Sequence, residues 1–180
     1  KSFLLWLYTQ IFRADLQPAG QVQQVLAAKG YTPDDVNTVL VSHLHADHIS
    51  ELQSFTNARF IGSRRAFEVV SKARSLRAAL VHGSFLELLP NDYADRLLAI
   101  EDLPAIELPL GLGAGWVLVE DQVSIVPLEG HAVGHFGVLW HDSQTLYAVD
   151  AHWLLSEIAA AEPLFGMSKS VASDVPAAEQ

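Results

Sequence analysis

The chain has no cysteine, which excludes both disulfide bonds and thiolate metal sites. Any metal ion would have to be bound by histidine, aspartate or glutamate side chains, or by water. The 8 histidines and 21 acidic residues are therefore the side chains among which a metal site must be sought.

Basic residues are also scarce, since 11 lysines and arginines face 21 acidic residues and the formal net charge is −10. Nucleic acid binding needs a basic face, so nucleic acid is not expected as a partner. Long apolar runs are missing too. The apolar stretch at residues 3–8 is too short to span a bilayer and lacks a small-residue cleavage signal. We therefore expect a cytoplasmic protein without a membrane partner, in which this stretch joins the core or an oligomer contact such as a dimer.

What is present is a globular composition: 180 residues, of which 50% are hydrophobic and 18% charged. This length fits a single domain over residues 1–180. The spacing of apolar residues predicts an α/β fold with helices at residues 18–29, 50–55 and 63–72. Strands are predicted at residues 38–41, 59–62, 106–108, 116–119, 122–127, 136–140 and 145–149.

Three histidines and an aspartate are concentrated in the segment Ser-His-Leu-His-Ala-Asp-His, residues 42–48. The segment follows an apolar run at residues 38–41 that we expect to be a buried strand. On an extended backbone His43 and His45 point to the same side, so one ion can contact both. Asp47 and His48 follow where the chain must turn and can face a second ion. A solvated histidine-rich loop is the alternative, but four potential ligands at the end of a strand favour a metal site.

A second cluster, Glu-Gly-His-Ala-Val-Gly-His at residues 129–135, follows another predicted strand. A glycine before His131 and another before His135 lets the backbone approach closely, as a metal-lined turn requires. Further along, the strand at residues 146–149 ends in Asp150. A carboxylate at the end of a buried strand is unfavourable unless a positive charge meets it, and a dinuclear metal site would supply that charge.

The three features, His-x-His-x-Asp-His, Gly-His-x-x-Gly-His and a strand-ending aspartate, resemble the metallo-β-lactamase superfamily in type and order over about residues 39–153. The resemblance implies an αββα sandwich whose loops bind one or two metal ions. It assigns His43, His45 and His131 to the first ion, Asp47 and His48 to the second, and Asp150 to a bridge between them. His135 is usually a supporting residue in this family. The expected cofactors are two divalent ions, zinc first, with iron, manganese or cobalt as alternatives.

Two family features are absent from the sequence. No Asp-Thr-Gly-like segment precedes His43, and after Asp150 only His152 remains, too close to supply the last ligand of the second ion. The resemblance therefore implies that part of the N-terminal strands and the C-terminal end of the sandwich are missing from this chain.

Within the superfamily the sequence looks most like the N-acyl homoserine lactone lactonase branch. That branch commonly has a tyrosine three residues after the bridging aspartate, where this chain has Trp153, a candidate substrate-binding residue with one N–H donor. The function implied is a metallo-hydrolase in which a metal-bound hydroxide opens a lactone or other ester of a small molecule. Asp47 would orient the nucleophile and carry a proton. The alternatives are a thioesterase like glyoxalase II, a phosphodiesterase, or a non-catalytic domain that binds a metal or ligand.

Overall fold

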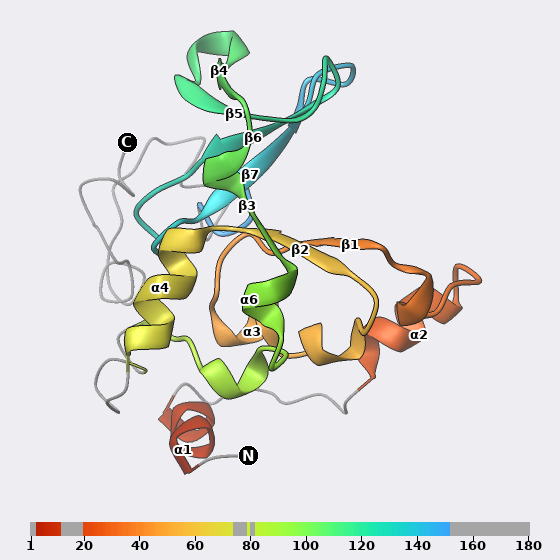
Figure 1. The fold of residues 1–180 in the computed structure, drawn as a ribbon, viewed down its shortest axis with the longest axis vertical. Helices are drawn as coiled ribbons and strands as arrows, with labels where there is room; N and C mark the ends of the chain where they lie inside the picture. The colour runs from red at the N-terminus through yellow and green to blue at the C-terminus, as the bar shows by residue number, and fades with distance from the viewer. Residues whose placement is uncertain (1–2, 12–19, 74–78, 80–81, 152–180) are drawn as a thin grey trace.

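A computed structural model describes residues 3–11, 20–73, 79 and 82–151 of the chain (Figure 1). Its helices are α1 (Phe3–Ile11), α2 (Gln21–Ala27), α3 (Ala46–Ile49), α4 (Arg64–Lys72) and α6 (Tyr93–Arg96). Its strands are β1 (Thr38–Leu40), β2 (Arg59–Gly62), β3 (Leu97–Ala99), β4 (Ala105–Glu107), β5 (Ala114–Val119), β6 (Val123–Pro127), β7 (Phe136–Trp140) and β8 (Thr145–Tyr147). Single 3₁₀ turns lie at Pro33–Asp35, Leu52–Ser54, Leu86–Leu88, Ile100–Asp102 and Pro109–Gly111.

The first half of the chain forms a parallel sheet in the order β1-β2-β3. Phe60 of β2 pairs with Val39 of β1 and with Leu97 of β3. The side chain of Phe60 is fully buried and stacks on Tyr93 of α6, with the ring centroids 5.1 Å apart. Ile49 of α3 and Val70 of α4 belong to the same core cluster. Helices thus cover one face of this sheet, as parallel strands joined by crossovers require.

The second half forms an antiparallel meander in the order β4-β5-β6-β7-β8, so each strand pairs with its neighbour in sequence. Its last hairpin joins β7 to β8, with Trp140 opposite Thr145. Gln144 completes this short turn with a φ of 48°. Because every connection is local, the alternating apolar pattern of the sequence is enough to specify the pairing.

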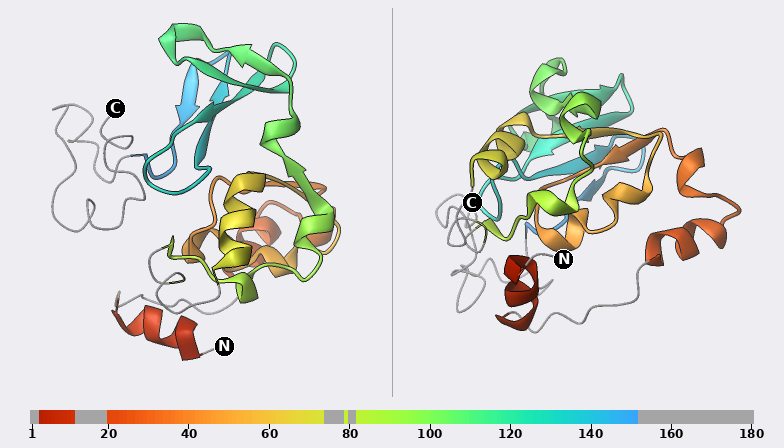
Figure 2. Two further views of the ribbon diagram at one scale, coloured as in Figure 1. Left: turned by 60° about the vertical axis from the view of Figure 1, so that its left-hand side comes forward. Right: turned by 60° about the horizontal axis from the view of Figure 1, so that its bottom comes forward.

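The two sheets share a core, which positions the loops at their ends. Ile61 of β2 lies in one buried cluster with Ile125 of β6 and Val138 of β7. At the edge of this core the backbone N–H of Phe136 donates a hydrogen bond to the carbonyl oxygen of Ser42, with an N···O distance of 3.1 Å. This bond ties the start of β7 to the segment after β1, and Figure 2 shows the antiparallel sheet standing against the helix-covered sheet. The segments before β7 and after β1 therefore meet.

The α/β class expected from the sequence is confirmed, and the described residues show the helix, sheet and sheet layers of the expected sandwich. The bounds of β2 and β7 match the prediction, and α4 begins directly after its predicted cap. Ser63 is that cap, since its Oγ accepts a hydrogen bond from the backbone N–H of Ala66 at 3.1 Å. No helix in the described part of the chain has the length and apolar character needed to cross a bilayer.

Four expectations were wrong or incomplete. The strand expected at residues 145–149 is β8, which ends at Tyr147 and is not buried, so Asp150 lies in the turn after the strand. The strand before the histidine motif is not buried throughout, because Leu40 is 40% exposed. Within the described ranges β1 pairs with β2 alone, so its other edge is open. The helix expected at residues 50–55 is wrong: α3 ends at Ile49, and the predicted range holds only the 3₁₀ turn Leu52–Ser54. The short strand β3 was not predicted, because three residues carry too little periodicity.

The packing of Phe60 yields a stability prediction. We expect Phe60→Ala to lower the free energy of unfolding by about 3–5 kcal/mol, because a buried ring is lost and a cavity remains. Phe3→Ala is the matched control, since Phe3 is 67% exposed and its loss should change stability by less than about 0.5 kcal/mol. Urea unfolding followed by circular dichroism measures both. Equal effects of the two substitutions would contradict this core assignment.

Candidate metal centre

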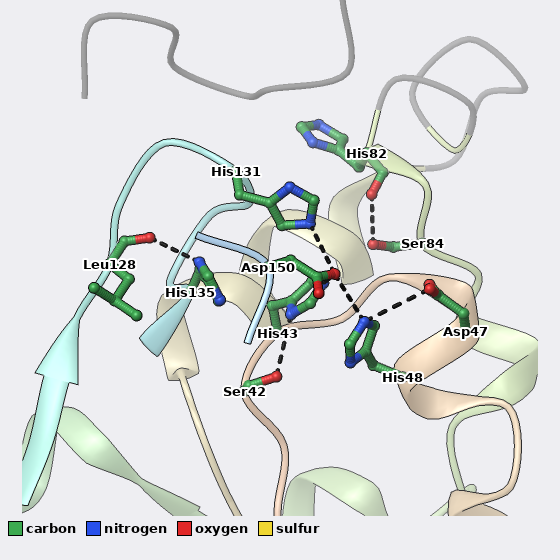
Figure 3. A network of polar contacts seen from close by, with 10 residues as sticks. All are labelled: Ser42, His43, Asp47, His48, His82, Ser84, Leu128, His131, His135 and Asp150. Carbon is green, nitrogen blue, oxygen red and sulfur yellow. Dashed lines mark hydrogen bonds and ion pairs between the residues drawn. The ribbon is translucent and has the colours of Figure 1, made fainter. Parts of the chain in front are cut away.

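The predicted site residues come together where the ends of the two sheets meet (Figure 3). His43 and His45 lie in the segment after β1, and α3 carries Asp47 and His48. The loop between β6 and β7 brings the second motif, and Asp150 follows β8. The site is thus assembled from segments about a hundred residues apart in sequence, such as His48 and Asp150.

Two overlapping groups of donor atoms are formed. In the first, His43, His45 and His131 each offer a ligand atom, and these atoms all lie within 4.8 Å of one another. The imidazole rings of His45 and His131 are 4.5 Å apart between centroids, and each lies within 4.9 Å of the His43 ring. In the second group, His43, His48 and Asp150 meet the same distance criterion.

Asp150 belongs to the second group and also approaches the first. Its Oδ2 atom is 2.9 Å from Nε2 of His48, 3.4 Å from Nε2 of His131 and 3.6 Å from Nε2 of His43. A single carboxylate oxygen therefore faces histidines of both groups, which is the position that a bridging ligand requires. The preceding residue, Val149, has a φ of 53°, an unusual conformation for a β-branched residue. Strain of this kind costs about 1–3 kcal/mol and is often found where a functional side chain must be aimed.

Burial keeps four histidines of the site neutral: His43, His45, His131 and His135. It lowers the pKa of His45 to about 3 and that of His135 to about 4, with neighbouring histidines adding to the shift. The pKa values of His43 and His131 are also lowered, in both cases mainly by burial. Neutral imidazole is the form that binds a metal ion. In addition, Nε2 of His43 is buried without a hydrogen-bond partner among the described residues. The donor set and this atom fit a divalent cation.

His135 and Gly134 hold the second motif in place. Nδ1 of His135 lies 2.8 Å from the carbonyl oxygen of Leu128, so the ring donates its N–H to the backbone of its own loop. Gly134 has a φ of 67°, and a Cβ there would collide with Ser63 Oγ at the start of α4. The loop therefore packs tightly on α4 and fixes the position of His131. This agrees with a supporting role for His135.

The structure does not bring every predicted residue into the donor groups. The side chain of Asp47 is 76% exposed, with its Oδ2 atom 3.6 Å from Nε2 of His48, and it belongs to neither group. It lies in the first turn of α3, where its carboxylate turns toward solvent. Trp153 and His152 lie outside the described residues. His82, which has no motif around it in the sequence, lines a pocket together with His45 and His131.

Comparison with known proteins establishes the family. The model of the metallo-beta-lactamase superfamily matches residues 8–175, which is most of the chain. The chain belongs to the metallo-beta-lactamase superfamily. No curated protein sequence gives a significant match. The family resemblance carried by the two histidine motifs and Asp150 is thereby confirmed.

Solved structures of this superfamily share the fold at low sequence identity. A probable metal-dependent hydrolase from Staphylococcus aureus has a TM-score of 0.68 and 17% identity, over 95% of this chain and 56% of that one. A second structure is an N-acyl homoserine lactone hydrolase with the product N-hexanoyl-L-homoserine bound at its catalytic metal center. It has a TM-score of 0.59 and 22% identity, over 87% of this chain and 52% of that one. A dizinc quorum-quenching lactonase has a TM-score of 0.61 and 16% identity, over 92% of this chain and 57% of that one. The chain thus spans little more than half the length of these structures.

The buried histidines predict a stability that depends on pH. Their pKa is lower in the folded than in the unfolded chain, so the unfolded chain binds more protons as the pH falls below about 6.5. Their contribution is fully present above about pH 6.5 and is lost below it. For the metal-free protein we expect a loss of up to about 1.4 kcal/mol per pH unit for each such histidine between about pH 6.5 and 5.

Urea unfolding at several pH values measures this slope. The variant His135→Gln is the matched comparison, because it should remove one histidine's share of the slope while the others remain. A stability that stays constant between about pH 7 and 5 would contradict the neutral, buried state of the histidine cluster.

Proposed function

We propose that this chain is the metal-binding part of a metallo-hydrolase that opens a lactone or another ester of a small molecule. The observation that carries the proposal is the pair of donor groups joined at Asp150, whose Oδ2 atom is within 3.6 Å of three histidine nitrogens. We infer that His43, His45 and His131 bind one divalent ion, and that His48 and Asp150 bind a second. Zinc is the expected ion, because imidazole and carboxylate ligands suit it.

A bound zinc ion supplies two kinds of chemistry: it lowers the pKa of a water molecule from about 15.7 to about 7 and stabilises negative charge on an ester oxygen. The residues of the chain do the rest. Burial of the histidine cluster keeps the imidazoles neutral and excludes bulk water from the inner side of the site. Asp47 lies at the exposed edge, 3.6 Å from His48, where its carboxylate can accept a proton and pass it to the leaving alcohol.

A small-molecule substrate agrees with the surroundings of the site. A cleft of about 280 Å³ borders His48 and is lined by apolar side chains, among them Phe136, Val138 and Trp140. This volume is close to that of small-molecule sites, which begin at about 300 Å³. The lactone preference is supported by the fold likeness to lactonases with bound N-hexanoyl-L-homoserine. Trp153 remains a proposed contact with the substrate, and residues 1–180 a proposed single domain.

Metal binding and turnover should both depend on His43, which belongs to both donor groups. We expect the wild-type chain to retain zinc after dialysis and to hydrolyse at least one class in a panel of lactones, thioesters and phosphodiesters. His43→Ala should lower zinc affinity and hydrolysis by more than about 100-fold, beyond what the loss of a supporting residue costs. Elemental analysis and initial rates measure the two effects.

His141→Ala is the matched control, because His141 lies in the β7–β8 turn and its Nε2 atom is 2.9 Å from Ser124 Oγ. It should retain wild-type metal content and activity. The hydrolase proposal is rejected if the metal-loaded wild type hydrolyses no substrate of the panel and His43→Ala behaves in the same way. Zinc bound without turnover would favour a binding domain.

Asp150 gives a separate prediction about the number of metal ions. Asp150→Asn keeps the shape of the side chain but removes its negative charge, so the second ion should be lost while the three-histidine group keeps the first. We expect zinc stoichiometry to fall from about two to about one per chain in isothermal titration calorimetry. The exposed Asp142→Asn should leave the stoichiometry unchanged. Two zinc ions per chain in Asp150→Asn would show that Asp150 is not needed as a bridge.

A further inference from the structure

A narrow pocket opens beside the first donor group. Its polar lining consists of His45, His82, Ser84 and His131, and its apolar lining includes side chains of α4 and of the loop before β7. The enclosed space is about 20 Å³, which is enough for one group of the size of a water molecule. Ligand atoms that reach this space would lie next to two of the three histidines of the first donor group.

The segment of residues 82–84 is fixed against that donor group by its backbone. The N–H of Ala46 donates a hydrogen bond to the carbonyl oxygen of Gly83 at 2.9 Å. Gly83 has a φ of 57°, and a Cβ there would lie 3.2 Å from Cδ2 of His45. The hydroxyl of Ser84 in turn donates to the carbonyl oxygen of His82 at 2.8 Å. The contacts of Gly83 therefore hold the segment of residues 82–84 beside the histidine motif.

These contacts leave His82 as the side chain suited to bind a ligand in the pocket. Two of the four polar lining residues, His45 and His131, belong to the donor group, and the Ser84 hydroxyl is used by the backbone. His82 belongs to neither donor group within the described residues. Figure 3 shows its ring beside that of His131, on the outer side of the cluster. An imidazole N–H there can donate to an oxygen atom of a ligand.

We propose that His82 is a substrate-binding residue that donates a hydrogen bond to an oxygen of the acyl group, in the ester substrate and in its carboxylate product. This inference rests on the proposed function, because the metal at His43, His45 and His131 would hold the scissile group beside the pocket. The small volume of the pocket suits a single oxygen atom of the ligand, while the rest of the ligand stays outside it.

The test uses butyrate as a simple carboxylate product and the zinc-loaded chain. Zinc affinity is measured first by calorimetry, and butyrate is then titrated while histidine ring signals are followed by NMR. We expect butyrate to shift the His82 ring signals and His82→Ala to bind butyrate about tenfold more weakly, the loss expected for one hydrogen bond. His82→Gln keeps an N–H donor and should stay within about threefold of the wild type. Zinc affinity should be unchanged in both variants.

His141→Ala serves again as the control histidine, and its butyrate affinity should equal that of the wild type. If zinc binding is normal and the wild type and His82→Ala bind butyrate equally well, the role of His82 is overturned. The proposed function is not affected by that result. The same holds if the zinc-loaded wild type does not bind butyrate, or if His82→Gln is as weak as His82→Ala. If the wild-type chain does not bind zinc in calorimetry, the proposed function itself is overturned.

Discussion

The approach of three histidines to one carboxylate oxygen is the interaction on which the site depends. Asp150 Oδ2 lies within 3.6 Å of nitrogen atoms from His43, His48 and His131, which come from two different segments. Neutral imidazole nitrogens that face one carboxylate oxygen, two of them from buried rings, are unfavourable without a cation to share their lone pairs. The hydrogen bond between Phe136 and Ser42 joins the sheets just beside this cluster. The fold and the proposed metal chemistry therefore depend on the same junction.

Much of this was predictable from the sequence, because the decisive features are local. The histidine motif follows β1, and the strand β2 and the cap Ser63 were found from apolar spacing and residue type alone. Only the family resemblance predicted that His131 and Asp150 lie beside the first motif. Spacing within each segment says nothing about segments about a hundred residues apart. The family model over residues 8–175 supports that resemblance.

The rest depended on tertiary packing that has no sequence signal. Leu40 of β1 is 40% exposed, although the apolar run suggested a buried strand, and among the described residues β1 pairs only with β2. Asp47 matches the family motif, yet its place in the first turn of α3 turns the carboxylate outward. His82 carries no motif, and the hydrogen bond between Ala46 and Gly83 holds its segment beside the donor group. Such residues are found from contacts, because their role comes from a neighbour distant in sequence.

The central claim is that His43, His45 and His131 bind a metal ion and that Asp150 bridges it to a second one. The most direct test is anomalous diffraction at the zinc absorption edge from crystals of the zinc-loaded chain. We expect one anomalous peak among the nitrogen atoms of the three histidines and a second beside His48, with Asp150 between them. Anomalous peaks at other residues, with none in the histidine cluster, would contradict it.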